Sequence, residues 1–121
     1  MAFKVLLADD LYFMRMVQKE VLESKGFQIV AEASTGTEAV AKYQELRPDI
    51  VVLDITMPEM NGLEAMKRIF ASDPDAKIII CSAIGQQNLI VDAINSWIKD
   101  FIVKPFKPER LLSAITKALR A

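Results

Sequence analysis

Five short apolar runs divide the chain into regular segments and constrain its fold more than any other feature. They occupy residues 3–8, 28–33, 50–53, 78–81 and 101–103. Most are rich in Val, Ile and Leu and lack alternating polar residues, which is typical of parallel strands covered on both faces. The segments between them carry apolar residues three or four positions apart, as amphipathic helices do. The sequence therefore predicts alternating strands and helices.

The helical spacing and its punctuation place five helices, one after each strand. Their apolar positions are Met14, Val17, Val21 and Leu22; Ala39, Val40, Tyr43 and Leu46; Leu63, Met66, Ile69 and Phe70; Ile90, Ile94 and Trp97; and Leu111, Leu112, Ile115 and Leu119. Gly26 and Pro48 suit helix ends, and Pro108 suits a first turn. Gly62 fits either a turn that needs positive φ or the start of the third helix.

Repeated strand and helix units with right-handed crossovers favour a doubly wound α/β fold. We expect a flavodoxin-like, five-stranded parallel sheet of order 2-1-3-4-5 with helices on both faces. The 121 residues, 52% of them hydrophobic, fit one domain spanning residues 1–121.

The charge balance and hydropathy exclude several classes of partner. Fifteen basic and sixteen acidic residues give a net charge of −1, which argues against nucleic acid and anionic membranes. No run approaches the roughly 18 apolar residues of a membrane span. The start, Met-Ala-Phe-Lys, leads into a strand and does not resemble a signal peptide. We therefore expect a cytoplasmic protein.

Cysteine and histidine usage limits the chemistry. The single Cys81 lies within an apolar run, so we expect a core residue in a reducing compartment. Histidine is absent, which excludes histidine-based triads and His-ligated zinc. Any catalysis must use carboxylates, hydroxyls, lysine or a metal bound by oxygen.

Polar residues stand directly after four of the five apolar runs. They are Asp9 and Asp10, Asp54, Ser82 and Lys104. Because ligand sites of open parallel sheets form at the carboxyl ends of the strands, we expect these residues to converge. Three carboxylates in one cleft favour a hard cation, and Mg²⁺ suits oxygen ligands. A lysine and a hydroxyl suit phosphoryl oxygens, so the pattern predicts an aspartyl phosphate on Asp54.

Taken singly, each of these residues also has a plainer interpretation. Asp10 is suited to capping the first helix, and Ser82 to capping the loop after the fourth strand. Lys104 is consistent with a solvated loop charge. Their joint placement at strand ends favours a shared site.

Four motifs resemble the receiver domain of bacterial response regulators over essentially the whole chain. They are Ala8-Asp9-Asp10, Asp54-Ile55-Thr56-Met57-Pro58-Glu59-Met60-Asn61-Gly62, Cys81-Ser82-Ala83 and Lys104-Pro105-Phe106. With Phe13-Met14-Arg15 and no output domain, the chain is similar to the single-domain chemotaxis type.

The resemblance implies a phosphoacceptor and a metal site. Asp54 would accept a phosphoryl group from a sensor histidine kinase. Mg²⁺ would bind Asp10, Asp54 and the backbone carbonyl of Thr56, with Asp9 acting through the water shell of the metal. A flagellar motor switch protein and a phosphatase would be further partners.

The resemblance also implies a phosphoryl-binding pair and a switch. Ser82 and Lys104 would bind the phosphoryl group, and Ser82 and Phe101 would move together on phosphorylation. The Lys104–Pro105 peptide bond would be cis.

One segment departs from the family pattern. Receivers of this type usually read Ala-Gly-Ala where this chain has Ser96-Trp97-Ile98. Trp97 in place of a helix-ending glycine implies either strain or a longer helix. An altered hinge at Trp97 and Ile98 suggests one hypothesis, a dimer that exchanges the C-terminal strand and helix. The other hypothesis is a monomer in which Trp97 is accommodated locally.

Three functions remain open. A phosphorylation switch that acts only on itself, and is otherwise not an enzyme, agrees with the complete set of site residues. A haloacid dehalogenase-like phosphohydrolase would carry Asp-x-Asp, but position 56 is Thr. A receiver used as an unphosphorylated scaffold for protein binding would have lost an acid or the lysine, and none is lost.

Overall fold

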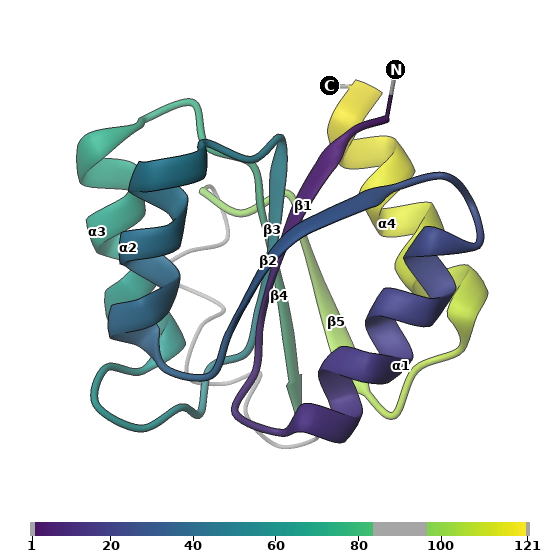
Figure 1. Cartoon of the computed structure of the whole chain (residues 1–121), viewed down its shortest axis with the longest axis horizontal. Helices are drawn as coiled ribbons and strands as arrows, with labels where there is room; N and C mark the ends of the chain where they lie inside the picture. The colour runs from purple at the N-terminus through teal and green to yellow at the C-terminus, as the bar shows by residue number, and fades with distance from the viewer. Residues whose placement is uncertain (1, 84–96, 121) are drawn as a thin grey trace.

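The computed structural model describes residues 2–83 and 97–120 and confirms the alternating pattern (Figure 1). The strands are β1 (Lys4–Ala8), β2 (Gln28–Ala33), β3 (Ile50–Leu53), β4 (Ile78–Ala83) and β5 (Asp100–Lys104). The helices of the two ranges are α1 (Tyr12–Glu23), α2 (Gly36–Leu46), α3 (Gly62–Ser72) and α4 (Pro108–Arg120).

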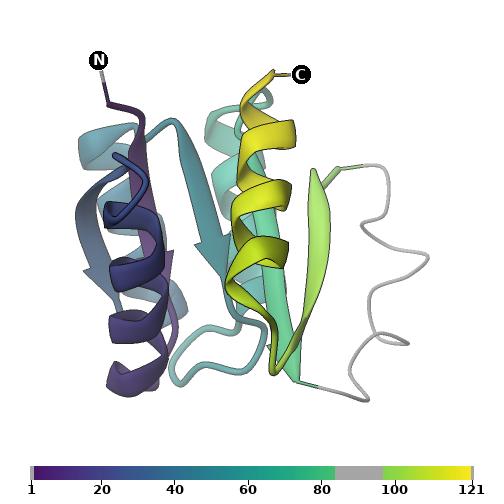
Figure 2. The same cartoon turned by 90° about the vertical axis from the view of Figure 1, so that its right-hand side faces the viewer.

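The strands form one parallel sheet of order β2-β1-β3-β4-β5, which confirms the predicted fold. Helices α2 and α3 cover one face of this sheet, and α1 and α4 cover the other (Figures 1 and 2). All strands run toward the end of the sheet at which α1 begins, away from the two chain ends. The carboxyl ends of the strands therefore meet at one edge.

Successive strand residues enter opposite cores, which explains why the apolar runs do not alternate. Leu6 packs in the core under α2 and α3, where Met66 and Ile69 join it. Its neighbour Leu7 packs in the core under α1 and α4, with Leu22 as one partner. A strand buried on both faces gains stability from an apolar side chain at every position.

Helix ends follow the sequence signals. Gly26 takes φ 87° after α1, in the left-handed region that glycine adopts freely. Thr35 caps α2 by accepting a hydrogen bond from the Glu38 amide at 3.0 Å, and Asn61 caps α3 in the same way. Arg47 ends α2 at φ 46° without a glycine.

The C-terminal third differs from the prediction at its edges. Strand β4 extends to Ala83 and β5 begins at Asp100, so Ser82 lies inside a strand. The predicted helix through Ile90 and Ile94 lies outside the described residues.

Trp97 itself lies in a turn and is half exposed. Its ring meets Phe70 edge to face, with centroids 6.0 Å apart. Ile98 follows it and packs against the α2 and α3 core. Strand β5 pairs with β4 of its own chain, and exchange between chains stays a prediction.

Within residues 2–83 and 97–120, no helix combines the length and apolar character needed to cross a membrane.

Candidate functional site

Two aspartates follow the central strands at the carboxyl edge of the sheet. Ala8 of β1 is in register with Leu53 of β3, so the residues after them, Asp9 and Asp54, emerge side by side. The Asp9 amide donates to the Ala33 carbonyl at 3.0 Å, and the Asp54 amide donates to the Ala8 carbonyl at 2.9 Å. Both residues are buried, with 1% and 6% of their surface exposed. The sheet therefore holds the start of both loops rigidly.

Asp10 completes a cluster of three carboxylates. One oxygen from each of Asp9, Asp10 and Asp54 lies within 4.8 Å of the other two, and Asp10 is exposed. Beside them lies a cleft of about 340 Å³, lined by Asp10, Leu11, Asp54, Thr56, Ala83 and Lys104. Clustered carboxylate oxygens open to water on one side are the ligands that Mg²⁺ prefers, so the donor set fits this ion.

Lys104 closes the cluster from the end of β5. Its Nζ donates to Asp9 Oδ2 at 2.6 Å and lies 3.5 Å from Asp54 Oδ1. Burial lowers the pKa of Lys104, but the hydrogen bond to Asp9 and the nearby Asp54 charge outweigh it, and the net direction is upward. Lys104 is thus a held ammonium group and not a solvated loop charge. The Lys104–Pro105 peptide bond is cis, in agreement with the resemblance.

The electrostatic setting of Asp54 favours a proton or a cation. Burial raises its pKa from 3.8 to about 6, the Lys104 charge opposes this, and the Asp9 charge adds to it. An ionised Asp54 is therefore poorly compensated by the protein alone. A bound dication would supply the missing positive charge.

The loop after β3 folds tightly back on Asp54. The Gly62 amide donates to the Ile55 carbonyl at 2.7 Å, and a β-carbon at Gly62 would lie 1.9 Å from the Asp54 carbonyl oxygen. The positive φ considered for Gly62 is wrong, because Gly26 is the only described glycine with a positive φ. Close backbone approach is the reason for glycine here. Ile55 and Met57 are buried and anchor the loop, whereas Thr56 faces outward.

The turn between β1 and α1 is organised by Asp9. Its Oδ1 accepts a hydrogen bond from the Leu11 amide at 2.9 Å. The N-cap residue of α1 is Leu11, and no side chain caps this helix, so the capping role considered for Asp10 is wrong. Asp10 thus remains in the cleft, where its carboxylate faces water.

Ser82 and Phe101 lie on the strands next to the cleft. Ser82 is fully buried and pairs in register with Val103 of β5. Ala83, one residue later, lines the cleft. Phe101 is partly buried and packs against the core under α2 and α3. The structure thus unites Asp9, Asp10, Asp54 and Lys104 most closely.

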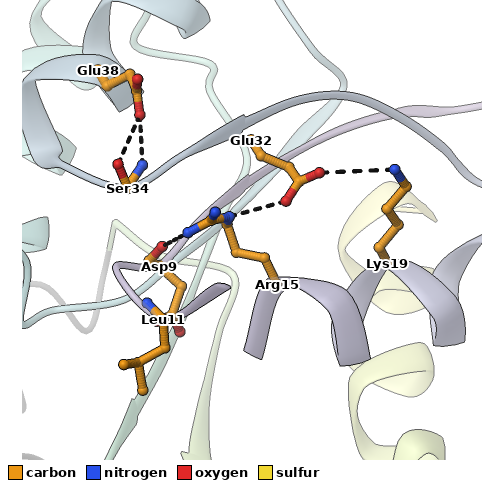
Figure 3. A network of polar contacts seen from close by, with 7 residues as sticks. All are labelled: Asp9, Leu11, Arg15, Lys19, Glu32, Ser34 and Glu38. Carbon is orange, nitrogen blue, oxygen red and sulfur yellow. Dashed lines mark hydrogen bonds and ion pairs between the residues drawn. The ribbon is translucent and has the colours of Figure 1, made fainter. Parts of the chain in front are cut away.

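Arg15 is the site residue that sequence reasoning missed. Its Nη1 donates to the Asp9 carbonyl at 2.6 Å, and its Nε donates to Glu32 Oε1 at 3.0 Å (Figure 3). Glu32 belongs to β2, and no local pattern links it to a residue seventeen positions earlier. The only sequence signal is that Arg15 follows Asp9 by six residues, close enough to turn back from the first turns of α1.

A buried polar residue in the α1 and α4 core was also missed. Gln18 is buried four residues after Met14, a spacing that could have revealed it, and its Oε1 has no hydrogen-bond partner among the described residues. Burial raises the pKa of the neighbouring Cys81 to about 12, so the thiol stays neutral. Cys81 is the core residue that was expected.

Comparison with known proteins identifies the family. The family model for the response regulator receiver domain matches residues 5–116 of the chain. The chain is 56% identical over 117 residues to the chemotaxis protein CheY of Listeria monocytogenes serovar 1/2a, covering 97% of this chain and 98% of that protein. It is 54% identical over 117 residues to CheY of Thermotoga maritima, with the same coverage.

A solved structure has the same architecture. The CheX-CheY-BeF3-Mg+2 complex from Borrelia burgdorferi superposes with a TM-score of 0.89 at 38% identity, over 95% of this chain and 87% of that chain. The high identity over nearly the full length agrees with the match of the family model. The chain therefore belongs to the family of response regulator receiver domains.

Proposed function

We propose that this chain is a phosphorylation-dependent signalling switch of a two-component system in chemotaxis, and that Asp54 is its phosphoacceptor. One observation carries the proposal. The Asp54 carboxylate lies at the carboxyl edge of the sheet, within 4.8 Å of two further carboxylates and 3.5 Å from a held ammonium group. Such a site suits phosphoryl transfer, in which catalysis is mostly positioning and charge neutralisation.

In the proposed reaction, a carboxylate oxygen of Asp54 attacks the phosphorus of the donor. The new oxygen–phosphorus bond forms as the bond to the donor breaks, and the donor keeps that electron pair. A sensor histidine kinase would donate through a phosphorus–nitrogen bond. Lys104 lies close enough to move from Asp9 toward the incoming phosphoryl oxygens. We assign Ser82 to the same phosphoryl group because it directly precedes Ala83, which lines the cleft.

The acidic residues would hold Mg²⁺. Asp10 and Asp54 would be direct ligands with the Thr56 carbonyl, and Asp9 would act through bound water. When bound, Mg²⁺ would neutralise charge on the phosphoryl oxygens. The protein contributes the fixed direction of the carboxylates, since both loops start from hydrogen-bonded strand ends.

The response would travel through β5. Phe101 lies three residues before Lys104 and packs against the α2 and α3 core, so a shift of Lys104 and Ser82 is positioned to change its packing. A flagellar motor switch protein is the proposed reader, and a phosphatase would end the signal. The Borrelia burgdorferi complex, in which a CheY is bound to CheX, supports a protein partner for such a chain.

Intact mass spectrometry tests the proposal. The chain is incubated with Mg²⁺ and a small phosphodonor, with Asp54→Asn as the control because it keeps the shape of the side chain and removes the nucleophile. We expect one adduct with the mass of a phosphoryl group, stable in acid and labile in base, and none in the variant.

The other outcomes separate the competing functions. Absence of an adduct would support an unphosphorylated scaffold. Continuous release of phosphate from varied esters would support a phosphohydrolase. An adduct that persists in Asp54→Asn would move the phosphoacceptor to another residue.

A further inference from the structure

Arg15 contacts the loop that carries the exposed carboxylate Asp10 through its side chain and through its backbone amide. Its side chain donates to the Asp9 carbonyl at 2.6 Å, and its backbone amide donates to the Leu11 carbonyl at 3.2 Å. These two carbonyls flank Asp10. Asp9 itself is held by its amide, its carbonyl and both carboxylate oxygens. The Arg15 side chain therefore restrains the peptide group that precedes Asp10, and the bond from the Leu11 amide to Asp9 Oδ1 restrains the one that follows it.

Glu32 orients the Arg15 guanidinium. One carboxylate oxygen of Glu32 accepts from Arg15 Nε at 3.0 Å, and the other lies 3.8 Å from Lys19 Nζ (Figure 3). The Arg15 side chain is only 14% exposed, whereas that of Lys19 is 43% exposed. A planar guanidinium held at one edge by a carboxylate directs its remaining donors, so Arg15 reaches the Asp9 carbonyl in a fixed geometry.

We propose that Arg15, oriented by Glu32, is a positioning residue of the cation site that fixes the direction in which Asp10 enters the cleft. The inference rests on the proposed function, since it concerns the affinity for Mg²⁺. Outer residues that orient metal ligands commonly change metal affinity by about 10- to 100-fold when they are replaced.

The lost charge of Arg15 and its lost positioning role predict opposite effects of Arg15→Gln on the affinity for Mg²⁺. Arg15→Gln removes a cation close to three carboxylates, and by charge alone this would strengthen binding of a dication. If Arg15 positions the loop, the same substitution weakens binding. Arg15→Lys keeps the charge but loses the planar fork that reaches Glu32 and the Asp9 carbonyl together. It should also weaken binding, to a smaller extent.

Lys19→Gln is the matched control. It removes the same charge from the same helix and the same Glu32 partner, and Lys19 makes no contact with Asp9 among the described hydrogen bonds and ion pairs. Titration calorimetry of the full chain with Mg²⁺ should give about tenfold weaker binding for Arg15→Gln. For Lys19→Gln we expect an affinity within about twofold of the unmodified chain, or slightly tighter, because the effect is screened charge alone.

Amide hydrogen exchange of Leu11 measures the order of the loop and requires no metal. This amide donates to Asp9 Oδ1, so it reports the order of the loop. Exchange should become faster in Arg15→Gln and Arg15→Lys and stay unchanged in Lys19→Gln. Circular dichroism establishes that each variant is folded, and Arg15→Lys serves if Arg15→Gln is not.

One outcome would contradict the inference, and another would contradict the proposed function. A folded Arg15→Gln variant that binds Mg²⁺ as tightly as the unmodified chain or more tightly, with unchanged Leu11 exchange, would overturn the inference. If the unmodified chain bound no Mg²⁺, the proposed function would fail, and Leu11 exchange would decide whether Arg15 holds the loop.

Discussion

Gly62 lies so close to Asp54 that a β-carbon on the glycine would stand 1.9 Å from the Asp54 carbonyl oxygen. The contact joins the first residue of α3 to the residue after β3. The Gly62 amide also donates to the Ile55 carbonyl, so the intervening loop closes on itself. Backbone packing at the start of α3 therefore fixes where the proposed phosphoacceptor stands.

Gly62→Ala should destabilise the fold and disturb Asp54 together. Because the added methyl group meets backbone atoms, the loop must move, and overpacking of this kind costs about 1–3 kcal/mol. Urea denaturation should show this loss in the free energy of unfolding. The yield of the Asp54 adduct should fall in the same variant.

Gly26→Ala is the control for that substitution. Gly26 has φ 87° and no heavy atom within 4 Å of an added β-carbon, so only backbone strain of about 1 kcal/mol is expected. The adduct yield should not change. An equal loss of adduct in both variants would show that lower stability alone explains the effect of Gly62→Ala.

Asp54→Asn should stabilise the metal-free chain at neutral pH. The pKa of Asp54 rises from 3.8 to about 6 on folding, mainly through burial, so the folded state loses stability as pH rises between these values. Asparagine does not titrate. The gain in the free energy of unfolding of Asp54→Asn over the unmodified chain should be absent below about pH 4 and reach about 2–3 kcal/mol above about pH 6.

Denaturation curves with a chelator across this pH range measure that difference. Excess Mg²⁺ should reduce it at pH 7, because the ion stabilises the ionised carboxylate. A difference independent of pH would show that burial of the Asp54 charge is not its cause.

The fold could be predicted from sequence because strong local signals agree with it. Unalternated runs indicated strands buried on both faces, and Gly26 marked the end of α1 by its backbone freedom. The strand ends were less certain. Residues such as Ala83 and Asp100 pair with neighbouring strands through backbone hydrogen bonds, which place little demand on their side chains.

The site could be predicted only at the level of which residues converge. The topology brings Asp9, Asp54 and Lys104 to one edge, and that was expected. The partner of each charged side chain could not be predicted, because it depends on side-chain rotamers from elements far apart in sequence. Lys104 bonds more closely to Asp9 than to Asp54, and Arg15 reaches a backbone carbonyl that carries no sequence signal.

Lys104→Met should separate metal binding from phosphorylation. Lys104 donates to Asp9 Oδ2 at 2.6 Å and so competes with a cation for the same carboxylates. Its removal should tighten Mg²⁺ binding several-fold through the lost repulsion. Formation of the Asp54 adduct should slow by at least about tenfold, because the proposed donor to the phosphoryl oxygens is lost.

Lys107→Met is the control for Lys104→Met, since it makes the same chemical change at an exposed position before α4. Calorimetry and the rate of adduct formation should both match the unmodified chain. Weaker Mg²⁺ binding in Lys104→Met would contradict competition for Asp9 and indicate that the ammonium group orders the carboxylates.

Trp97 should be accommodated within a monomer. Its ring packs edge to face on Phe70 of α3, which gives the indole a local partner without a second chain. Light scattering at several concentrations, before and after heating and slow cooling, should therefore give one monomeric species. Trp97→Ala should lower the free energy of unfolding by about 1 kcal/mol through loss of the aromatic pair, and Trp97→Phe should lower it less. A dimer that grows after slow cooling would instead support exchange of β5 and α4 between chains, because only unfolding releases them.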